Sequence, residues 1–143
     1  MAAGNRLPME GTIFISVNDF DKGAILKLAR DFQNLGFQLV ATRGTAEWLN
    51  RVGLKTSIIN KVSEGSPHIG DAIARGEIQL IVNTPLGRTA YSDGEQIRRA
   101  AIRYKIPLVT TLSATAAAIG AIRALRSKDL SVQSLQEHHK SQG

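Results

Sequence analysis

The sequence predicts an open α/β fold, in which helices cover both faces of a parallel sheet. Three observations lead to this prediction. Short runs of apolar and β-branched residues alternate with segments of helical periodicity. The runs are apolar at almost every position, as strands buried on both faces are. The connections are short and bounded by glycine, and the length of 143 residues suits one domain.

Five short segments are the candidate strands. Three consist almost wholly of apolar and β-branched residues, and these are 12–17, 79–83 and 107–111. Two weaker runs of the same kind occupy 38–41 and 56–59. We therefore expect one sheet built from these five segments.

The candidate helices lie between and after these strands. In the first of them apolar side chains recur three and four residues apart, and Gly36 ends the pattern. The third is expected to begin at Ser66 as N-cap, with Pro67 at the first helical position. In the fourth, Ser92 and Glu95 have the spacing of a capping box. The five segments are 25–35, 45–52, 66–76, 92–104 and 114–125.

The two ends of the chain differ from its middle. Residues 12–126 are expected to form one folded domain, preceded by a linker at 1–11. Residues 127–143 lack a sustained apolar period, which predicts a C-terminal tail. No stretch approaches the ~20 consecutive apolar residues of a membrane span, and the first residues lack the apolar segment of a signal peptide. We therefore expect a cytoplasmic protein.

Small polar and basic residues follow the candidate strands. Ligands of open α/β sheets bind at the carboxyl ends of the strands, so these side chains are expected to meet at one edge. Gly44 allows the backbone to approach a ligand, and Thr42 and Thr45 lie at a helix N-terminus, which favours a phosphate. Lys22 and Lys61 would add positive charge, in line with the net charge of +6. The residues expected at this edge are Ser16, Asn18, Lys22, Thr42, Arg43, Gly44, Thr45, Asn60, Lys61, Asn83, Thr84, Thr110 and Thr111.

The same residues have simpler interpretations, and catalysis is not expected. Thr45 could serve only as an N-cap and Gly44 only as a turn residue. Ser16, His68 and Asp71 are the residue types of a hydrolytic triad, but a histidine in a first helical turn more often caps the helix or faces water. The sequence has no cysteine, no metal-ligand spacing of histidines, and neither the dinucleotide nor the P-loop glycine motif. No catalytic residue, metal or cofactor is therefore predicted.

Basic residues on or next to the last two candidate helices make nucleic acid an alternative partner. Such residues are usually the solvated face of a helix, and aromatic residues, at 5% of the chain, are too few for a stacking platform. We therefore expect no nucleic-acid partner. The basic residues concerned are Arg98, Arg99, Arg103, Lys105, Arg123 and Arg126.

Taken in order, the motifs are similar to those of a known family. They are Ile15-Ser16-Val17, Ala41-Thr42-Arg43-Gly44-Thr45-Ala46, Asn60-Lys61-Val62, Glu64-Gly65, Pro67-His68-Ile69, Asn83-Thr84-Pro85 and Ile97-Arg98-Arg99. The series resembles the C-terminal regulatory domain of carbamoyl phosphate synthetase large subunits over about residues 11–137. The order and spacing of these pieces, more than any single one, carry the resemblance.

The resemblance implies a methylglyoxal-synthase-like fold, a three-layer α/β/α sandwich around a five-stranded parallel sheet. It implies a domain that binds nucleotide monophosphates, with uridine monophosphate (UMP) inhibiting and inosine monophosphate (IMP) activating. The domain would thereby control carbamoyl phosphate synthesis for pyrimidine and arginine biosynthesis. Its partners would be the remaining domains of the large subunit and the glutaminase small subunit.

The resemblance also assigns roles to residues. Ser16 and Thr84 would line the mouth of the nucleotide site, and Thr110 matches a threonine associated with activation by ornithine. Pro85 stands where some relatives carry a threonine, which puts one hydrogen bond to the nucleotide in question. The residues that match contacts to the nucleotide are Lys22, Thr42, Gly44, Thr45, Lys61 and Asn83.

A free-standing methylglyoxal synthase, a lyase acting on a triose phosphate, is the alternative within the same superfamily. Its catalysis uses aspartates and a histidine. In this sequence Asp71 is the one counterpart, Thr84 stands where an acid is expected, and no histidine follows Leu86. The resemblance therefore favours the regulatory domain, and it leaves a homodimer open because relatives use this domain in subunit association.

Overall fold

The computed structural model describes residues 7–84 and 87–142, with side chains described at 7–84 and 94–128. Its five strands form one parallel sheet, as predicted. Their bounds are β1 Thr12–Val17, β2 Gln38–Ala41, β3 Thr56–Ile58, β4 Leu80–Thr84 and β5 Leu108–Val109. β5 is shorter than the predicted 107–111, because the hydroxyl of Thr111 already accepts the N–H of Ala114 in the next helix, at 3.0 Å.

The helices alternate with the strands along the chain. Their bounds are α1 Lys22–Asn34, α2 Arg43–Arg51, α3 Ile69–Ala74, α4 Gly87–Tyr104 and α5 Leu112–Gln142, and a short 3-10 turn, η1 Val62–Glu64, precedes α3. None of the helices in the described ranges is long and apolar enough to cross a membrane.

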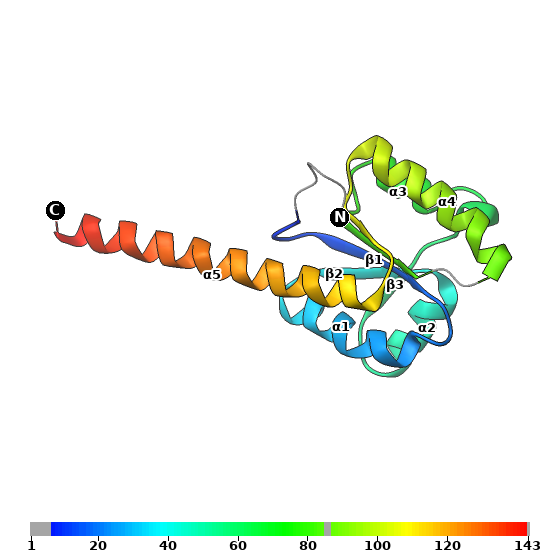
Figure 1. Cartoon of the computed structure of the whole chain (residues 1–143), viewed down its shortest axis with the longest axis horizontal. Helices are drawn as coiled ribbons and strands as arrows, with labels where there is room; N and C mark the ends of the chain where they lie inside the picture. Colours follow the sequence, from blue (N-terminus) through cyan, green and yellow to red (C-terminus); the bar gives the residue numbers. More distant parts are fainter. Residues whose placement is uncertain (1–6, 85–86, 143) are drawn as a thin grey trace.

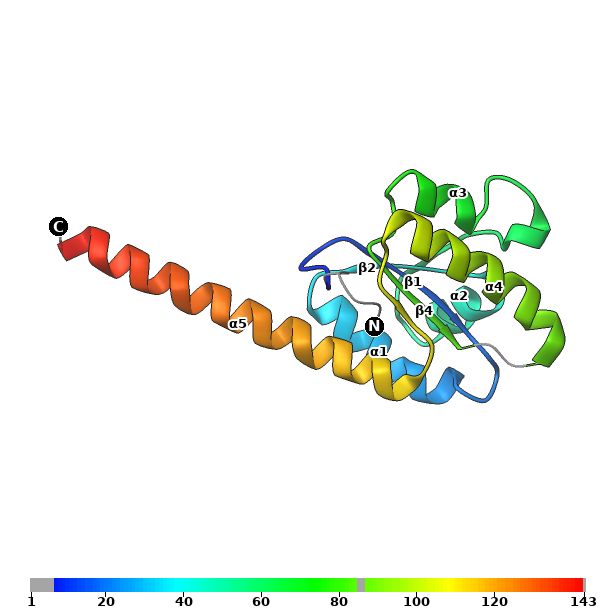
Figure 2. The ribbon, with the colours of Figure 1, turned by 45° about the horizontal axis from the view of Figure 1, so that its top comes forward.

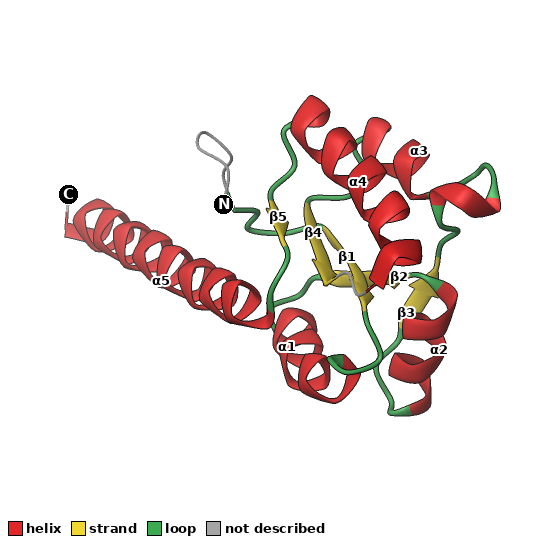
Figure 3. Ribbon diagram, turned by 45° about the vertical axis from the view of Figure 1, so that its right-hand side comes forward, coloured by secondary structure: helices red, strands yellow, loops and turns green. Residues whose placement is uncertain are grey.

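Helices cover both faces of the sheet, as Figures 2 and 3 show. Successive side chains of a strand point to opposite faces, so β1 sends Ile13 and Ile15 to one face and Phe14 to the other. α1, α2 and α5 pack on the first of these faces, and α3 and α4 pack on the second. The predicted three-layer α/β/α sandwich is thereby confirmed.

The strand order decides where a ligand can bind. The order across the sheet is β3-β2-β1-β4-β5. The chain starts at the centre, moves outward through β2 and β3, and then crosses to the other side of β1 to form β4. All the carboxyl ends lie along one edge, and the reversal of the order leaves a crevice there between β1 and β4.

The third helix begins later than predicted. Its N-cap is His68, not Ser66, and Nδ1 of His68 accepts the backbone N–H groups of Gly70 and Asp71 at 3.0 and 3.4 Å. In return, the carboxylate of Asp71 accepts the N–H of His68 at 2.9 Å. A parallel bridge between Asn60 and His68 keeps the chain extended up to His68, so the helix cannot begin at Ser66.

α4 starts earlier than predicted. It begins at Gly87, so Ser92 lies inside the helix and the predicted capping box with Glu95 is wrong. Serine and aspartate are only mildly unfavourable within a helix, so a helix that has begun at Gly87 can continue through Ser92 and Asp93.

α5 continues to Gln142 instead of ending at Leu125, and its C-terminal half extends away from the rest of the domain (Figure 1). The segment from Leu125 to Gln142 contains neither glycine nor proline, so no residue in it stops the helix. The loss of apolar periodicity therefore marks the end of the buried helical face and not the end of the helix.

Candidate functional site

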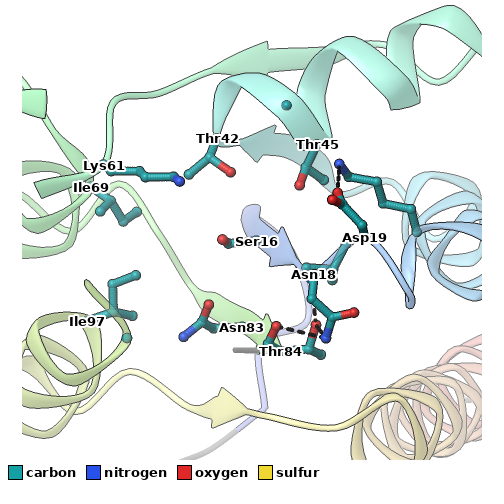
Figure 4. Close-up of a pocket in the computed structure, with 14 residues that line it drawn as sticks. Ser16, Asn18, Asp19, Thr42, Thr45, Lys61, Ile69, Asn83, Thr84 and Ile97 are labelled. Carbon is teal, nitrogen blue, oxygen red and sulfur yellow. Dashed lines mark hydrogen bonds and ion pairs between the residues drawn. The ribbon is translucent and has the colours of Figure 1, made fainter. Parts of the chain in front are cut away.

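A pocket of about 280 Å³ opens at the carboxyl edge of the sheet. Its residues come from the ends of β1, β2 and β4, from the loop after β3, and from the helices beside them (Figure 4). The structure brings together in this lining all eight residues that the resemblance assigns to the nucleotide site. They are Ser16, Lys22, Thr42, Gly44, Thr45, Lys61, Asn83 and Thr84.

The N-terminus of α2 forms one wall of the pocket. Thr42 is the N-cap, yet its side chain makes no capping hydrogen bond. Because the first backbone N–H groups of a helix have no acceptor within it, those of α2 can serve a ligand. A methyl carbon added at Gly44 would lie 3.8 Å from Nζ of Lys22, so glycine leaves the space between the helix and this ammonium open. N–H donors and the positive end of the helix dipole make this wall suitable for an anion.

Lys22 is the first residue of α1, and its ammonium lies close to the N-terminus of α2. Its Nζ lies 2.5 Å from Oδ1 of Asp19, which also lines the pocket. The hydrogen bond from Lys22 and the charge of its ammonium hold the pKa of the Asp19 carboxyl below the ordinary value of 3.8. No role was expected for Asp19 from the sequence, although its position three residues before a lysine is a signal of such an ion pair.

Lys61 approaches the pocket from the loop that follows β3. Figure 4 shows its side chain directed toward Thr42. The backbone N–H of Lys61 donates to the Glu64 carboxylate at 2.7 Å, which fixes the start of η1 and hence the base of this side chain. Within the described parts of the chain, no carboxylate lies within ion-pair distance of the Lys61 ammonium.

The ends of β1 and β4 form the opposite wall. Ser16 pairs in register with Asn83, and both side chains face the pocket (Figure 4). The Thr84 hydroxyl accepts the backbone N–H of Asn18 at 3.2 Å, and the Asn18 side-chain amide donates to the Thr84 carbonyl at 3.2 Å and to the Asp21 carboxylate at 2.8 Å. Asn18 therefore joins the turn after β1 to the end of β4, a role that only the sheet order reveals.

The remaining wall is apolar. Ile69 of α3 and Ile97 of α4 line the pocket, although they are 0% and 4% exposed. Helical periodicity predicts both as core residues, and sequence reasoning did not connect them with a site. The pocket thus combines hydrogen-bond donors and two ammonium groups with an aliphatic wall.

Three other predictions fare differently. Thr110 is exposed after β5 and does not line the pocket. Pro85 lies outside the described residues. The triad of Ser16, His68 and Asp71 does not assemble, because Nδ1 of His68 accepts backbone amides and the carboxylate of Asp71 caps α3. The N–H of His68 and the hydroxyl of Ser66 hold the pKa of the Asp71 carboxyl below 3.8.

The side chains of the described residues include no group of three His, Asp or Glu that could hold a metal ion. The basic residues of α4 and α5 do not form one surface, because these helices cover opposite faces of the sheet. Several of them have partners within the chain: Arg99 pairs with Glu95 at 3.3 Å and Arg123 with Asp31 at 3.2 Å.

The structure defines an open α/β domain with a polar pocket at the carboxyl edge of its sheet, and the comparisons with known proteins identify its family. The sequence model of the MGS-like domain matches residues 24–110, and the chain belongs to this family. The predicted methylglyoxal-synthase-like family is thereby confirmed.

The most informative relatives are large chains of carbamoyl phosphate synthase. The chain is 50% identical over 141 residues to "Carbamoyl phosphate synthase large chain, C-terminal section" of Methanopyrus kandleri, covering 98% of this chain and 26% of that protein. It is 45% identical over 141 residues to the carbamoyl phosphate synthase large chain of Archaeoglobus fulgidus, covering 98% of this chain and 13% of that protein. The chain therefore spans only about a quarter or an eighth of the length of these relatives, and the similarity confirms the resemblance stated above.

A solved structure shares the fold. Methylglyoxal synthase from Elizabethkingia anophelis superposes with a TM-score of 0.61 over 77% of this chain and 76% of that one. The sequence identity is 20%, so this likeness bears on the fold alone.

Proposed function

We propose that this chain is the allosteric regulatory domain of a carbamoyl phosphate synthase large chain. In this proposal a nucleotide monophosphate such as UMP or IMP occupies the pocket, and its binding controls carbamoyl phosphate synthesis for pyrimidine and arginine biosynthesis. The domain catalyses nothing itself and acts in the cytoplasm with the remaining large-chain domains and the glutaminase small subunit.

One observation carries the proposal, namely that the pocket combines backbone N–H and ammonium donors with an aliphatic wall. The phosphate would lie at the N-terminus of α2, between Lys22 and Lys61. The ribose hydroxyls would reach the side chains of Asn83 and Ser16, and the base would contact the isoleucine wall. The volume of about 280 Å³ is close to the lower limit of ~300 Å³ for ligand pockets, which suits a single nucleotide and not a dinucleotide.

Regulation requires that the ligand bind two states of the whole enzyme with different free energies, typically by about 1–3 kcal/mol. An isolated domain has no catalytic state to bias. The relatives are about four to eight times longer than the matched segment, as the covered shares of 26% and 13% show, which leaves room for further domains on which such a bias would act. Ornithine, whose action the resemblance links to Thr110, would act outside the pocket, at a boundary with a neighbouring domain.

The alternative, a free-standing methylglyoxal synthase, shares the fold and a need to bind phosphate. That reaction needs an acid or base near the substrate. Among the described residues of the lining, Asp19 is the one carboxylate, and Lys22 holds it. The Asp71 carboxylate is engaged with the backbone of α3. These contacts favour a binding module over a lyase.

Calorimetry with UMP, IMP and uridine tests the proposal. We expect binding of at least one monophosphate and none of uridine, which lacks the phosphate. The double variant Lys22→Ala/Lys61→Ala should lose this binding and keep the circular dichroism spectrum of the parent. Release of methylglyoxal from dihydroxyacetone phosphate would support the lyase instead, and unchanged nucleotide affinity in the double variant would refute the site.

A further inference from the structure

Asp19 and Lys22 lie three residues apart in the turn that leads into α1, and both line the pocket. We infer that the Asp19 carboxylate is an internal competitor of the anionic ligand, occupying the Lys22 ammonium until a phosphate replaces it. This inference rests on the proposed function, because it concerns the regulation of the same site.

The two side chains differ in how firmly they are held. The Lys22 side chain is 24% exposed, whereas that of Asp19 is 89% exposed. The ammonium is therefore fixed against the pocket, beside Gly44 at the N-terminus of α2. The carboxylate reaches it from the solvent side and can leave without breaking any packing. A ligand that takes over Lys22 therefore has only the ion pair itself to displace.

The second lysine of the pocket makes the contrast clear. Lys61 has no carboxylate partner in the portion of the chain that the structure describes, so its charge is available to a ligand at once. The ammonium of Lys22 becomes available only when Asp19 withdraws. Of the two ammonium groups that would bind one phosphate, that of Lys61 is thus available and that of Lys22 is paired with Asp19.

The charge of Asp19 also acts directly on an incoming anion. Its Oδ1 lies 2.5 Å from Nζ of Lys22, so a phosphate oxygen bonded to that nitrogen would come within a few ångströms of the carboxylate. Two negative charges at such a distance repel one another even near a protein surface. Competition for the ammonium and repulsion between the anions both lower the affinity for the ligand, so removal of the carboxylate should raise it.

The test is the affinity of the Asp19→Asn variant for inorganic phosphate and for UMP, measured by calorimetry at low salt and pH 8. We expect both to bind roughly 2- to 5-fold more tightly than to the parent chain, which is the range of an exposed ion pair. Asp31→Asn is the matched control, since it removes the same charge from an ion pair with Arg123 that does not line the pocket. Its affinities should equal those of the parent.

A second comparison separates competition from a structural effect of the turn. In a Lys22→Met background, Asp19→Asn should give a much smaller gain in affinity, because the ammonium for which the carboxylate competes is absent. Unchanged or weaker binding by Asp19→Asn would overturn the inference, and weaker binding would show that Asp19 positions Lys22 for the ligand. An equal gain in Asp31→Asn, or a full gain in the Lys22→Met background, would also overturn it. If the parent chain binds none of inorganic phosphate, UMP and IMP, the proposed function itself fails.

Discussion

Asn18 and Thr84 join the two strands between which the strand order reverses. The Asn18 backbone N–H donates to the Thr84 hydroxyl, and the Asn18 side-chain amide donates to the Thr84 carbonyl, each at 3.2 Å. The contact fixes the turn that carries Asp19 and Lys22 relative to the end of β4, which carries Asn83. The geometry of the pocket therefore depends on Asn18, which also belongs to its lining.

Asn18→Ala should lower both stability and affinity. It removes the side-chain hydrogen bonds to Thr84 and Asp21, so the free energy of unfolding should fall by about 1–3 kcal/mol. The affinity for UMP should fall as well, because the turn loses its anchor. Urea denaturation and calorimetry measure the two effects. Asn50→Ala is the control: Asn50 holds the loop before β3 through bonds of 2.8 and 2.9 Å to Thr56, away from the pocket lining, so only stability should fall.

Ile97→Ala should lower the affinity for UMP without changing the affinity for inorganic phosphate. Loss of the aliphatic wall is expected to weaken UMP binding by roughly 10-fold, equal to about 1.4 kcal/mol, which is the contribution of about two methylenes buried against the base at about 0.8 kcal/mol each. The affinity for inorganic phosphate should not change. Ile119→Ala, which removes a side chain of the other core cluster, 2% exposed, should destabilise the fold without altering either affinity. Equal losses for UMP and phosphate would contradict the assignment of this wall to the base.

Asp71→Asn should make stability less dependent on acid pH. The backbone N–H of His68 lowers the pKa of Asp71 below 3.8 in the folded state, so the ionised carboxylate stabilises the fold above that pH. The contribution is lost as the pH falls below 3.8 through the folded-state value. The parent should therefore be more stable than the variant at pH 7, and the difference in urea midpoint should shrink toward pH 2.5. Glu77→Gln, in the exposed pair with Arg75, should show little difference at any pH, and a difference for Asp71→Asn that stayed constant would refute the cap.

Ile122→Ala should show that the first half of α5 is part of the core. Ile122 is 0% exposed and packs in the cluster that also contains Phe32 of α1. Its truncation should cost about 2–5 kcal/mol of unfolding free energy. Leu125, on the same helix but 45% exposed, should tolerate alanine within about 0.5 kcal/mol. Equal costs in urea denaturation would mean that the helix packs differently.

Much of the fold follows from local patterns in the sequence. Apolar runs and helical periods predict the five strands and the alternation with helices, because burial on both faces demands that pattern. The starts of α3 and α4 were not predictable in this way. The bridge from Asn60 delays α3 until His68, and α4 already includes the turns before Ser92. Both boundaries depend on contacts or turns outside the local cap motif.

The polar residues of the site were also readable in advance, since each follows the end of a strand and the carboxyl ends of parallel strands share one edge. The sequence by itself thus determined which hydroxyl, amide and ammonium groups face that edge. The tertiary structure alone decided that β1 lies beside β4, that Asn18 meets Thr84, and that Ile69 and Ile97 close the pocket. Those relations arise from strand order and helix packing between distant segments, and no local periodicity encodes them.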